Sequence, residues 1–388
     1  PILKIASVAV SIGVIMMLIA FATGLGLQKK IRDKIAAFNG HITITEFTSN
    51  STYEDFQPLS KDNDFYPDFK SVPSVSHVQT TASKYGVIRT EKDFEGVIAK
   101  GVGQDYKWSY LEEYLIDGEL PDFSPRYSKE VLISDNIADK LQFEVGDQLI
   151  IYFLSNQNTE RPRLLALTVS GIFDSGFQDF DDQFIFIDIN QVQRINKWSD
   201  DQVGNFEVFT NDFQSIDKTG EQVYSNIDSF LNAETITSQF PSVFEWLKMF
   251  DFNILIIFIV MIAVSGINMI TALLVLILER TQMVGIFKAM GASNWQIRKM
   301  FIFQASYLIL KGLFWGNLIG LGLLFIQKYA GIIKLDQSTY YVDKAPVYFS
   351  WDYILGINIG VLVCCFLIMI IPSYLIRKIT PVQAIKFE

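Results

Sequence analysis

The sequence predicts a membrane protein with four transmembrane α-helices and a large α+β extracytoplasmic domain between helices 1 and 2. Three observations lead to this fold class. Half of the 388 residues are hydrophobic, and many of them lie in four long apolar runs. Residues 41–251 hold 36 Asp and Glu against 16 Lys and Arg, whereas the remaining residues hold 6 against 16. Within the acidic stretch, short segments alternate between strand and helix patterns.

The apolar runs span residues 5–27, 252–278, 300–326 and 353–376. Each is close to the roughly 20 residues that a helix needs to cross a bilayer. Each also contains small residues, which allow helices to pack closely in lipid. The first run is too long for the core of a cleaved signal peptide. Because the chain opens on Pro1 rather than Met, we expect an upstream segment.

The runs divide the chain into segments. We expect transmembrane helix 1 and its extension over 1–40, the extracytoplasmic domain over 41–240, helix 2 over 241–278, an amphipathic helix and turn over 279–299, helix 3 over 300–326, an extracytoplasmic loop over 327–351, helix 4 over 352–376 and a tail over 377–388.

Lys and Arg in the short loops set the orientation, because such residues favour the cytoplasmic side. They gather in the 279–299 loop and in the tail, at Arg280, Lys288, Arg298, Lys299, Arg377, Lys378 and Lys386. These two segments are therefore expected in the cytoplasm, and the acidic domain outside. A basic cluster after the first run opposes this assignment, at Lys29, Lys30, Arg32 and Lys34. We expect it on a helix that continues out of the membrane, with its charges near lipid headgroups.

The acidic domain contains β-branched and aromatic segments that are typical of strands. We expect strands at 41–47, 77–90, 96–102, 130–134, 147–154, 163–173, 183–189 and 205–210, and helices at 109–116, 135–142, 189–198 and after Asp212. The domain is therefore predicted to be a mixed α+β structure.

The loop between the second and third runs has an amphipathic pattern. Its apolar residues at helical spacing are Met283, Ile286, Phe287 and Met290. Gly291 then suits a left-handed helix end, and Ser293 with Gln296 forms a capping-box pattern that opens the next helix. By pattern alone, this helix either rests on headgroups or docks into a partner.

The residues of this loop carry a family resemblance. ERTQMVGIFKAMGAS, residues 279–293, resembles the coupling-helix segment of FtsX-like permeases, the membrane subunits of type VII ABC transporters. The final residues TPVQAIKFE resemble the closing segment of the same family. The resemblance implies that a cytoplasmic ATPase binds this helix, through Glu279, Arg280, Met283, Ile286, Phe287, Lys288, Met290 and Gly291.

The chain itself has no G-x-x-x-x-G-K-S/T pattern with which to hold ATP phosphates. The resemblance therefore implies a separate ATPase, in two copies, that binds ATP and Mg, while this chain binds no cofactor. It also implies a second permease subunit, identical or related.

The acidic domain extends the resemblance. Residues 100–108, 117–121 and 129–151 look like the exterior core domain of the superfamily, and GIFDSGFQDFDDQFIFIDI (171–189) resembles a stretch of lipoprotein-releasing permeases. The resemblance implies two lobes, one of them inserted at about 104–192. It also implies that the polar loop 155–163 is a hook for a periplasmic lipoprotein carrier, with Arg161 and Pro162 in contact. An ordinary hairpin tip is the alternative.

The first two spans border the acyl-chain cavity in this family. The resemblance thus assigns lipid or cargo contacts to Met16, Met17, Phe21, Met261, Ile262 and Met269, although helix packing also explains these residues. Lys311 falls near the middle of the third run, where a charge marks a functional candidate. The alternatives are snorkelling and pairing with a polar group such as Asn268.

Other site classes find little support. His41 and His77 lie far apart without ligand spacing, and Asp174, Asp179, Asp181 and Asp182 lack a calcium-loop pattern, so we expect no metal. Cys364 and Cys365 lie within the fourth run. No catalytic constellation is visible, and an acidic domain does not favour nucleic acid.

The expected function is that of a permease subunit which, driven by ATP, extracts lipoproteins from the inner membrane for a periplasmic carrier. One alternative is a mechanotransmission subunit that activates a periplasmic partner such as a cell-wall hydrolase. Another is an efflux permease for small molecules or peptides.

Overall fold

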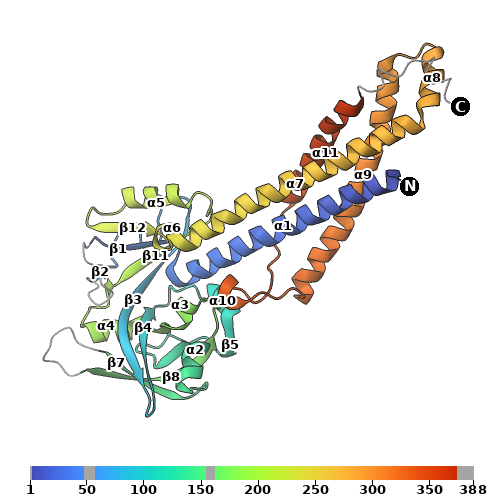
Figure 1. The fold of residues 1–388 in the computed structure, drawn as a ribbon. Coiled ribbons are helices and arrows are strands. Elements are labelled where there is room, and N and C mark those ends of the chain that lie inside the picture. The colour runs from blue at the N-terminus through green and yellow to red at the C-terminus, as the bar shows by residue number, and fades with distance from the viewer. Residues whose placement is uncertain (1, 48–56, 154–161, 374–388) are drawn as a thin grey trace. The chain divides into compact units, whose positions relative to one another are not determined.

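The computed structural model describes residues 2–47, 57–153 and 162–373 (Figure 1). The chain divides into two compact units. The helical unit comprises residues up to 29, 245–335 and from 344 onward; the sheet unit comprises 30–244 and 336–343. Each unit is described by itself below.

The described residues contain four helices that are long and apolar enough to cross a membrane, which confirms the predicted count. They are α1 (Ile2–Asn39), α7 (Pro241–Glu279), α9 (Asn294–Ala330) and α11 (Trp351–Ser373), and the short α8 (Thr281–Ala289) lies between α7 and α9. At about 1.5 Å per residue, the 38 residues of α1 reach roughly 57 Å, well beyond a hydrocarbon core of about 30 Å. The predicted continuation of the first span as a helix is therefore confirmed.

Small residues bring α1 and α9 into close contact in the helical unit. A side chain at Gly312 would place its Cβ 2.8 Å from Val10, and one at Gly316 would meet Val14 at the same distance. The Ser11 hydroxyl donates a 2.9 Å hydrogen bond to the Gly312 carbonyl. Packing through small residues, with a hydroxyl bonded across the helices, is how helices associate in lipid.

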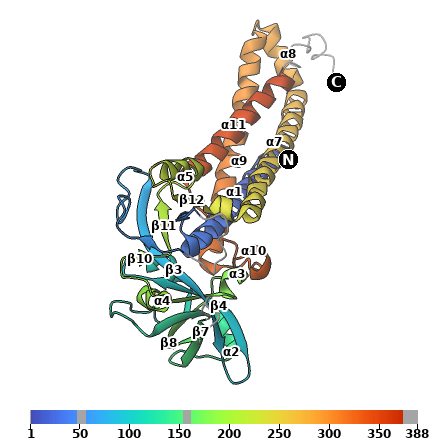
Figure 2. The same ribbon diagram turned by 90° about the vertical axis from the view of Figure 1, so that its left-hand side faces the viewer.

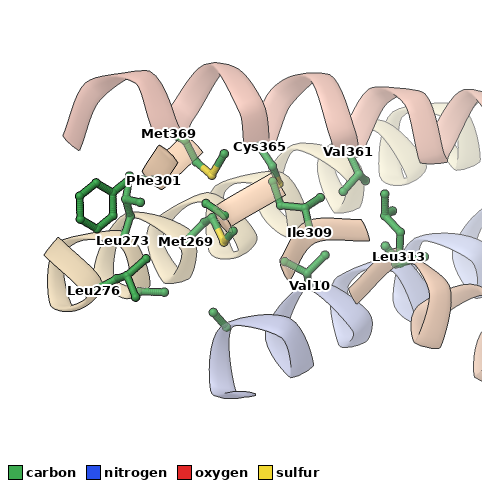
Figure 3. Close-up of a cluster of buried hydrophobic side chains, with 14 of the residues drawn as sticks. Val10, Met269, Leu273, Leu276, Phe301, Ile309, Leu313, Val361, Cys365 and Met369 are labelled. Atoms are coloured by element: carbon green, nitrogen blue, oxygen red, sulfur yellow. The ribbon is translucent and has the colours of Figure 1, made fainter. Parts of the chain in front are cut away.

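The core of the helical unit is built from all four long helices (Figure 3). Val10 of α1, Met269 of α7, Phe301 of α9 and Cys365 of α11 are buried within it. Val284 of α8 belongs to the same core, so the short helix is anchored to the bundle by its inner face.

The sheet unit is built on one ten-stranded sheet with the order β12-β1-β11-β3-β4-β9-β6-β8-β5, and β7 pairs with β3 and β8 (Figure 2). The strands are β1 (Ile42–Glu46), β3 (Val75–Arg89), β4 (Phe94–Val102), β5 (Leu115–Gly118), β6 (Glu130–Ser134), β7 (Gln148–Phe153), β8 (Arg163–Phe173), β9 (Phe184–Asp188), β11 (Asn205–Thr210) and β12 (Leu231–Thr235); β2 (Leu59–Ser60) and β10 (Gln202–Val203) pair separately. Most pairs are antiparallel, but β4–β9 and β6–β8 are parallel.

The described residues of this unit also form six short helices: α2 (Asp135–Leu141), α3 (Gln178–Asp181), α4 (Ile189–Asn196), α5 (Ile216–Ser225), α6 (Ile236–Gln239) and α10 (Gln337–Tyr340). The eight predicted strands and the helices at 135–142, 189–198 and after Asp212 are confirmed. The predicted helix at 109–116 is wrong. Residues 108–110 and 112–114 form two 3₁₀ turns, and Leu115–Gly118 pairs with β8 instead, so sheet pairing overrides the helical spacing.

A buried ion pair joins the sheet to the end of α1. The Lys100 ammonium lies 2.5 Å from a Glu207 carboxylate oxygen, and both side chains are almost fully buried. Lys100 also donates to the Phe38 carbonyl of α1, and the Gln79 amide donates to the other Glu207 oxygen at 2.8 Å. Each charge is paired and hydrogen-bonded, as burial requires.

Candidate functional site

The predicted amphipathic segment forms a helix at the end of the bundle, as expected. α8 starts after Arg280, which is its N-cap residue, and Glu279 is the last residue of α7. Glu279 and Arg280 are both exposed. The two charges that the family resemblance assigns to ATPase contact are therefore accessible on this chain.

The inner face of α8 is covered and its apolar outer face is not. Val284 and Gly285 are buried, whereas Ile286 is 49% exposed, Phe287 36% and Met290 78%. Met283 is half-buried. Apolar side chains that a chain leaves uncovered on one helix form a docking surface for a partner or for headgroups.

The turn after α8 has the geometry that the sequence predicts. Gly291 takes a φ of 89°, its N–H bonds to the Lys288 carbonyl, and the Ala292 N–H bonds to the Phe287 carbonyl. This pair of bonds is the Schellman motif. Ser293 and Gln296 then form the predicted capping box at the start of α9. The orientation of α8 is thus fixed at its C-terminal end by main-chain bonds.

Lys288 is half-buried on α8, and burial lowers the pKa of its ammonium. Sequence reasoning missed one exposed aromatic nearby. Trp295, on the first turn of α9, is 64% exposed, and its ring lies 5.7 Å from the Arg298 guanidinium. The residue was overlooked because the apolar run that predicts helix 3 begins only after it.

The six cargo-contact candidates do not share one surface. Met17 and Met269 are buried in the core of the helical unit, so in this structure they pack between helices, as the alternative interpretation holds. Met16 is 45% exposed on α1. Phe21, Met261 and Ile262 are half-buried, and Phe21 meets Phe258 of α7 edge to face at 6.2 Å.

A cavity opens between α1 and α9. Its volume is about 570 Å³, and it is lined by Ser7, Val8, Ser11, Ile12, Ile15, Leu308, Lys311, Trp315 and Ile319. This volume lies within the ~300–1,000 Å³ typical of ligand pockets. Lys311 thus borders an apolar groove, and within the described ranges no hydrogen bond joins it to Asn268.

The carrier-loop candidates are only partly described. Arg161 lies outside the described residues. Pro162 is exposed and directly precedes β8, which pairs with β7 in antiparallel register from Phe153 and Arg163 onward. β7 and β8 are therefore an antiparallel pair, and the role of residues 155–163 in carrier binding stays a prediction. The closing segment 380–388 also lies outside the described residues.

Three members of the basic cluster belong to the sheet unit and contact groups within it, and their position near headgroups stays a prediction. Lys30 pairs with Glu113 at 2.5 Å, and the Arg32 guanidinium lies 4.5 Å from the Phe213 ring. Lys34 is 5% exposed and donates to two backbone carbonyls. Acidic, aromatic and backbone carbonyl groups of the domain therefore contact these three cations. Only Lys29 falls in the helical unit, over the Tyr348 ring.

Within the described part of the chain, no group of three or more His, Cys, Asp or Glu side chains could hold a metal ion. Asp174, Asp181 and Asp182 instead accept hydrogen bonds from Gln337, Ser175 and Lys140. The His41 ring accepts a hydrogen bond from the Thr210 N–H. Burial and, to a smaller extent, the positive charge of Arg32 lower the pKa of His41 to about 4.

Comparisons with known proteins match this architecture. A model of the MacB-like periplasmic core domain matches residues 5–225, and a model of the FtsX-like permease C-terminal region matches residues 255–381. The chain is 21% identical to the lipoprotein-releasing system transmembrane protein LolC of Xylella fastidiosa, over 98% of this chain and 92% of the relative. It is also 21% identical to LolE of Haemophilus influenzae, over 98% of this chain and 93% of the relative.

Two solved structures resemble the chain at low TM-scores. The extracellular domain of the ABC-type transporter YknZ from Gram-positive bacteria has a TM-score of 0.35 at 15% identity, covering 50% of this chain and 99% of that domain. The periplasmic region of MacB from Actinobacillus actinomycetemcomitans has a TM-score of 0.34 at 12% identity, covering 52% of this chain and 91% of that region.

The family models and the four spans place the chain in the inner membrane as a multi-pass protein with a periplasmic domain. The chain belongs to the FtsX-like permeases with a MacB-like periplasmic core domain, which are membrane subunits of ABC transporters.

Proposed function

We propose that this permease is a subunit of an ATP-driven complex that extracts lipoproteins from the inner membrane and hands them to a periplasmic carrier. The observation that carries the proposal is the similarity to LolC and LolE along 98% of the chain, which spans both the membrane helices and the periplasmic domain. Two permease subunits, identical or related, would face each other, with two copies of a cytoplasmic ATPase below them.

The site geometry supports this assignment at the cytoplasmic end. α8 offers Ile286, Phe287 and Met290 as an uncovered apolar surface, while Val284 ties the helix to the bundle core. Short connections join α8 to α7 and α9, so an ATPase that binds α8 and moves it would also move these two helices. ATP and Mg would bind to that partner.

Energetics explain why such a complex needs ATP. Removing an acyl chain from a bilayer costs about 0.8 kcal/mol per methylene, or roughly 12 kcal/mol for a chain of about 15 methylenes. A lipoprotein with several such chains does not leave the membrane spontaneously at a useful rate. Acyl chains could contact two kinds of apolar surface on this subunit. One is the flexible, polarisable side chains of Met16 and Met261, and the other is the groove between α1 and α9 that Lys311 borders.

The test is reconstitution of the permease with its ATPase in proteoliposomes that contain a triacylated lipoprotein. The proposal predicts ATP-dependent transfer of the lipoprotein to a soluble carrier, and no transfer of the same protein without its acyl chains. Activation of a cell-wall hydrolase without any lipoprotein transfer would favour mechanotransmission instead. Export of a small molecule or peptide without transfer would favour an efflux permease.

A further inference from the structure

Residues 336–343, between α9 and α11, belong to the sheet unit although the residues on both sides belong to the helical unit. We call these eight residues the strap. They include the one-turn helix α10, which lies beside α3 in both views (Figures 1 and 2). The function proposed above assigns the strap no role.

Two contacts hold the strap on the loop that follows β8, and a third strap residue is buried. The Gln337 amide donates to both Asp174 carboxylate oxygens at 3.0 Å. The Tyr341 ring stacks on Phe177, with the ring centres 4.3 Å apart. Val342 is 4% exposed. A polar clamp, a ring stack and a buried apolar side chain thus act within eight residues.

Lys34 of α1 bonds both partners at once. Its ammonium donates to the Tyr341 carbonyl of the strap at 2.7 Å and to the Ser175 carbonyl of the loop. Burial, followed by the nearby Lys30, lowers the pKa of Lys34 to about 8, while Asp174, Asp181 and Asp343 act in the opposite direction. A buried cation shared between two carbonyls joins α1, the loop and the strap in one network.

The loop is shaped to receive the strap. Gly176 has a φ of 66°, and a Cβ added there would lie 2.4 Å from the Gln337 amide nitrogen. The Asp174 carboxylate also accepts the Gly176 N–H at 2.8 Å, and Asp181 accepts the Ser175 N–H. Hydrogen bonds between its own carboxylates and backbone therefore fix the conformation of the loop that contacts Gln337.

The two chain segments that lead to the strap have little slack. Within the helical unit, the Gln327 amide near the end of α9 donates to the carbonyls of Ile333 and Ala345, one on each segment. The Ala345 N–H bonds back to the Ile333 carbonyl at 3.0 Å. The five residues from 331 to 335 can span at most about 17 Å. Only a short segment of chain therefore separates the strap from the end of α9.

We propose that the strap is a transmission element that couples displacement of α9 and α11 to residues 174–182 of the periplasmic domain, and that the Gln337–Asp174 clamp keeps it engaged. The inference rests on the proposed ATP-driven mechanism, because it names a route by which movement at α8 reaches the domain. α1 and α7 are continuous helices, whereas this route runs through side-chain contacts that can be opened by substitution.

The decisive variant is Gln337→Glu in the full-length permease, assembled with its ATPase in nanodiscs. It replaces two hydrogen bonds with repulsion between carboxylates, so amide hydrogen exchange in residues 336–343 should accelerate about tenfold or more. In the wild type, ATP should also change hydrogen exchange in residues 174–182. In the variant this response should be lost and lipoprotein release per ATP should fall at least fivefold, while ATP hydrolysis continues.

Two further variants control the experiment. Asp174→Asn combined with Gln337→Glu reverses the amide and the carboxylate, and should restore slow exchange and release. Gln222→Glu makes the same chemical change at an exposed position of α5 and should alter neither measurement. Failure of the reversed pair to rescue would show that the clamp is not the cause, and would overturn the proposal.

The remaining outcomes separate the strap from the function on which it rests. Unchanged exchange in residues 336–343 of Gln337→Glu would refute the clamp. Faster exchange with a normal ATP response and normal release would refute transmission through it. A wild-type complex in which ATP alters residues 174–182 but releases no lipoprotein would overturn the proposed function and support the strap.

Discussion

A negative charge at Phe287 should detach the permease from its ATPase. Phe287 is 36% exposed on α8, and a Phe side chain presents ~200 Å² in total, so about 70 Å² remains for a partner to cover. At about 25 cal/mol per Å², this surface contributes roughly 1.8 kcal/mol to binding. Phe287→Glu removes it and places a carboxylate in an apolar interface, which costs at least another 1–3 kcal/mol. The expected loss is about 3 kcal/mol or more, or roughly 100-fold in Kd.

The assay is a titration of the ATPase against the permease in nanodiscs. The matched control is Gln282→Glu, which adds the same carboxylate to α8 at an exposed position off the apolar stripe. We expect the control to change Kd less than threefold. An unchanged Kd for Phe287→Glu would refute the docking of α8, because an exposed aromatic side chain of its apolar surface would then not be covered by the partner.

Three further changes test the structure itself. Gly291→Ala should destabilise the turn after α8 by about 1–2 kcal/mol, because residue 291 has a φ of 89°, which an L side chain disfavours even though the space around the added Cβ is open. Amide hydrogen exchange at residues 286–293 should become faster. Unchanged exchange would contradict the left-handed turn. Lys100→Met should lower the free energy of unfolding by about 3–5 kcal/mol by leaving Glu207 buried and unpaired, and adding Glu207→Leu should recover most of the loss in a denaturant titration; a single variant as stable as the wild type would contradict the ion pair. His41→Asn should weaken the acid sensitivity of unfolding. The pKa of His41 is lowered to about 4 in the folded protein, so protonation of its ring opposes folding. The free energy of unfolding should therefore fall by up to about 3 kcal/mol as the pH drops from 6.5 toward 4. Parallel profiles of unfolding free energy against pH for variant and wild type would contradict this.

Features that depend on local sequence were predictable. The four spans follow from apolar length, and the turn after α8 follows from Gly291 and the Ser293–Gln296 pair, each acting on its immediate neighbours. The eight predicted strands formed because β-branched residues occur in runs between turn residues. The 109–116 helix failed because its apolar spacing competed with pairing to β8, a partner more than fifty residues away.

Features that depend on distant residues were not predictable. Lys34 lies in a basic run that resembles a headgroup anchor, yet its ammonium bonds a carbonyl 307 residues later in the chain. The acidic stretch 174–182 lacks a ligand pattern, and nothing in its local sequence indicates that the Gln337 amide bonds to Asp174. The groove beside Lys311 likewise arises from close packing between α1 and α9, which requires knowing which helices meet. One signal was available in retrospect: Gly312, Gly316 and Gly320 recur every fourth residue on α9, a spacing that marks a close helix contact.

The central claim is that ATP hydrolysis by a partner bound at α8 lifts lipoproteins out of the membrane. The most direct measurement records ATP hydrolysis and lipoprotein transfer together in one proteoliposome sample containing the permease, the ATPase and a soluble carrier. The account predicts that transfer begins only when ATP is added, tracks hydrolysis, and disappears with Phe287→Glu but not with Gln282→Glu. Sustained hydrolysis by the assembled complex with no lipoprotein leaving the membrane would contradict it.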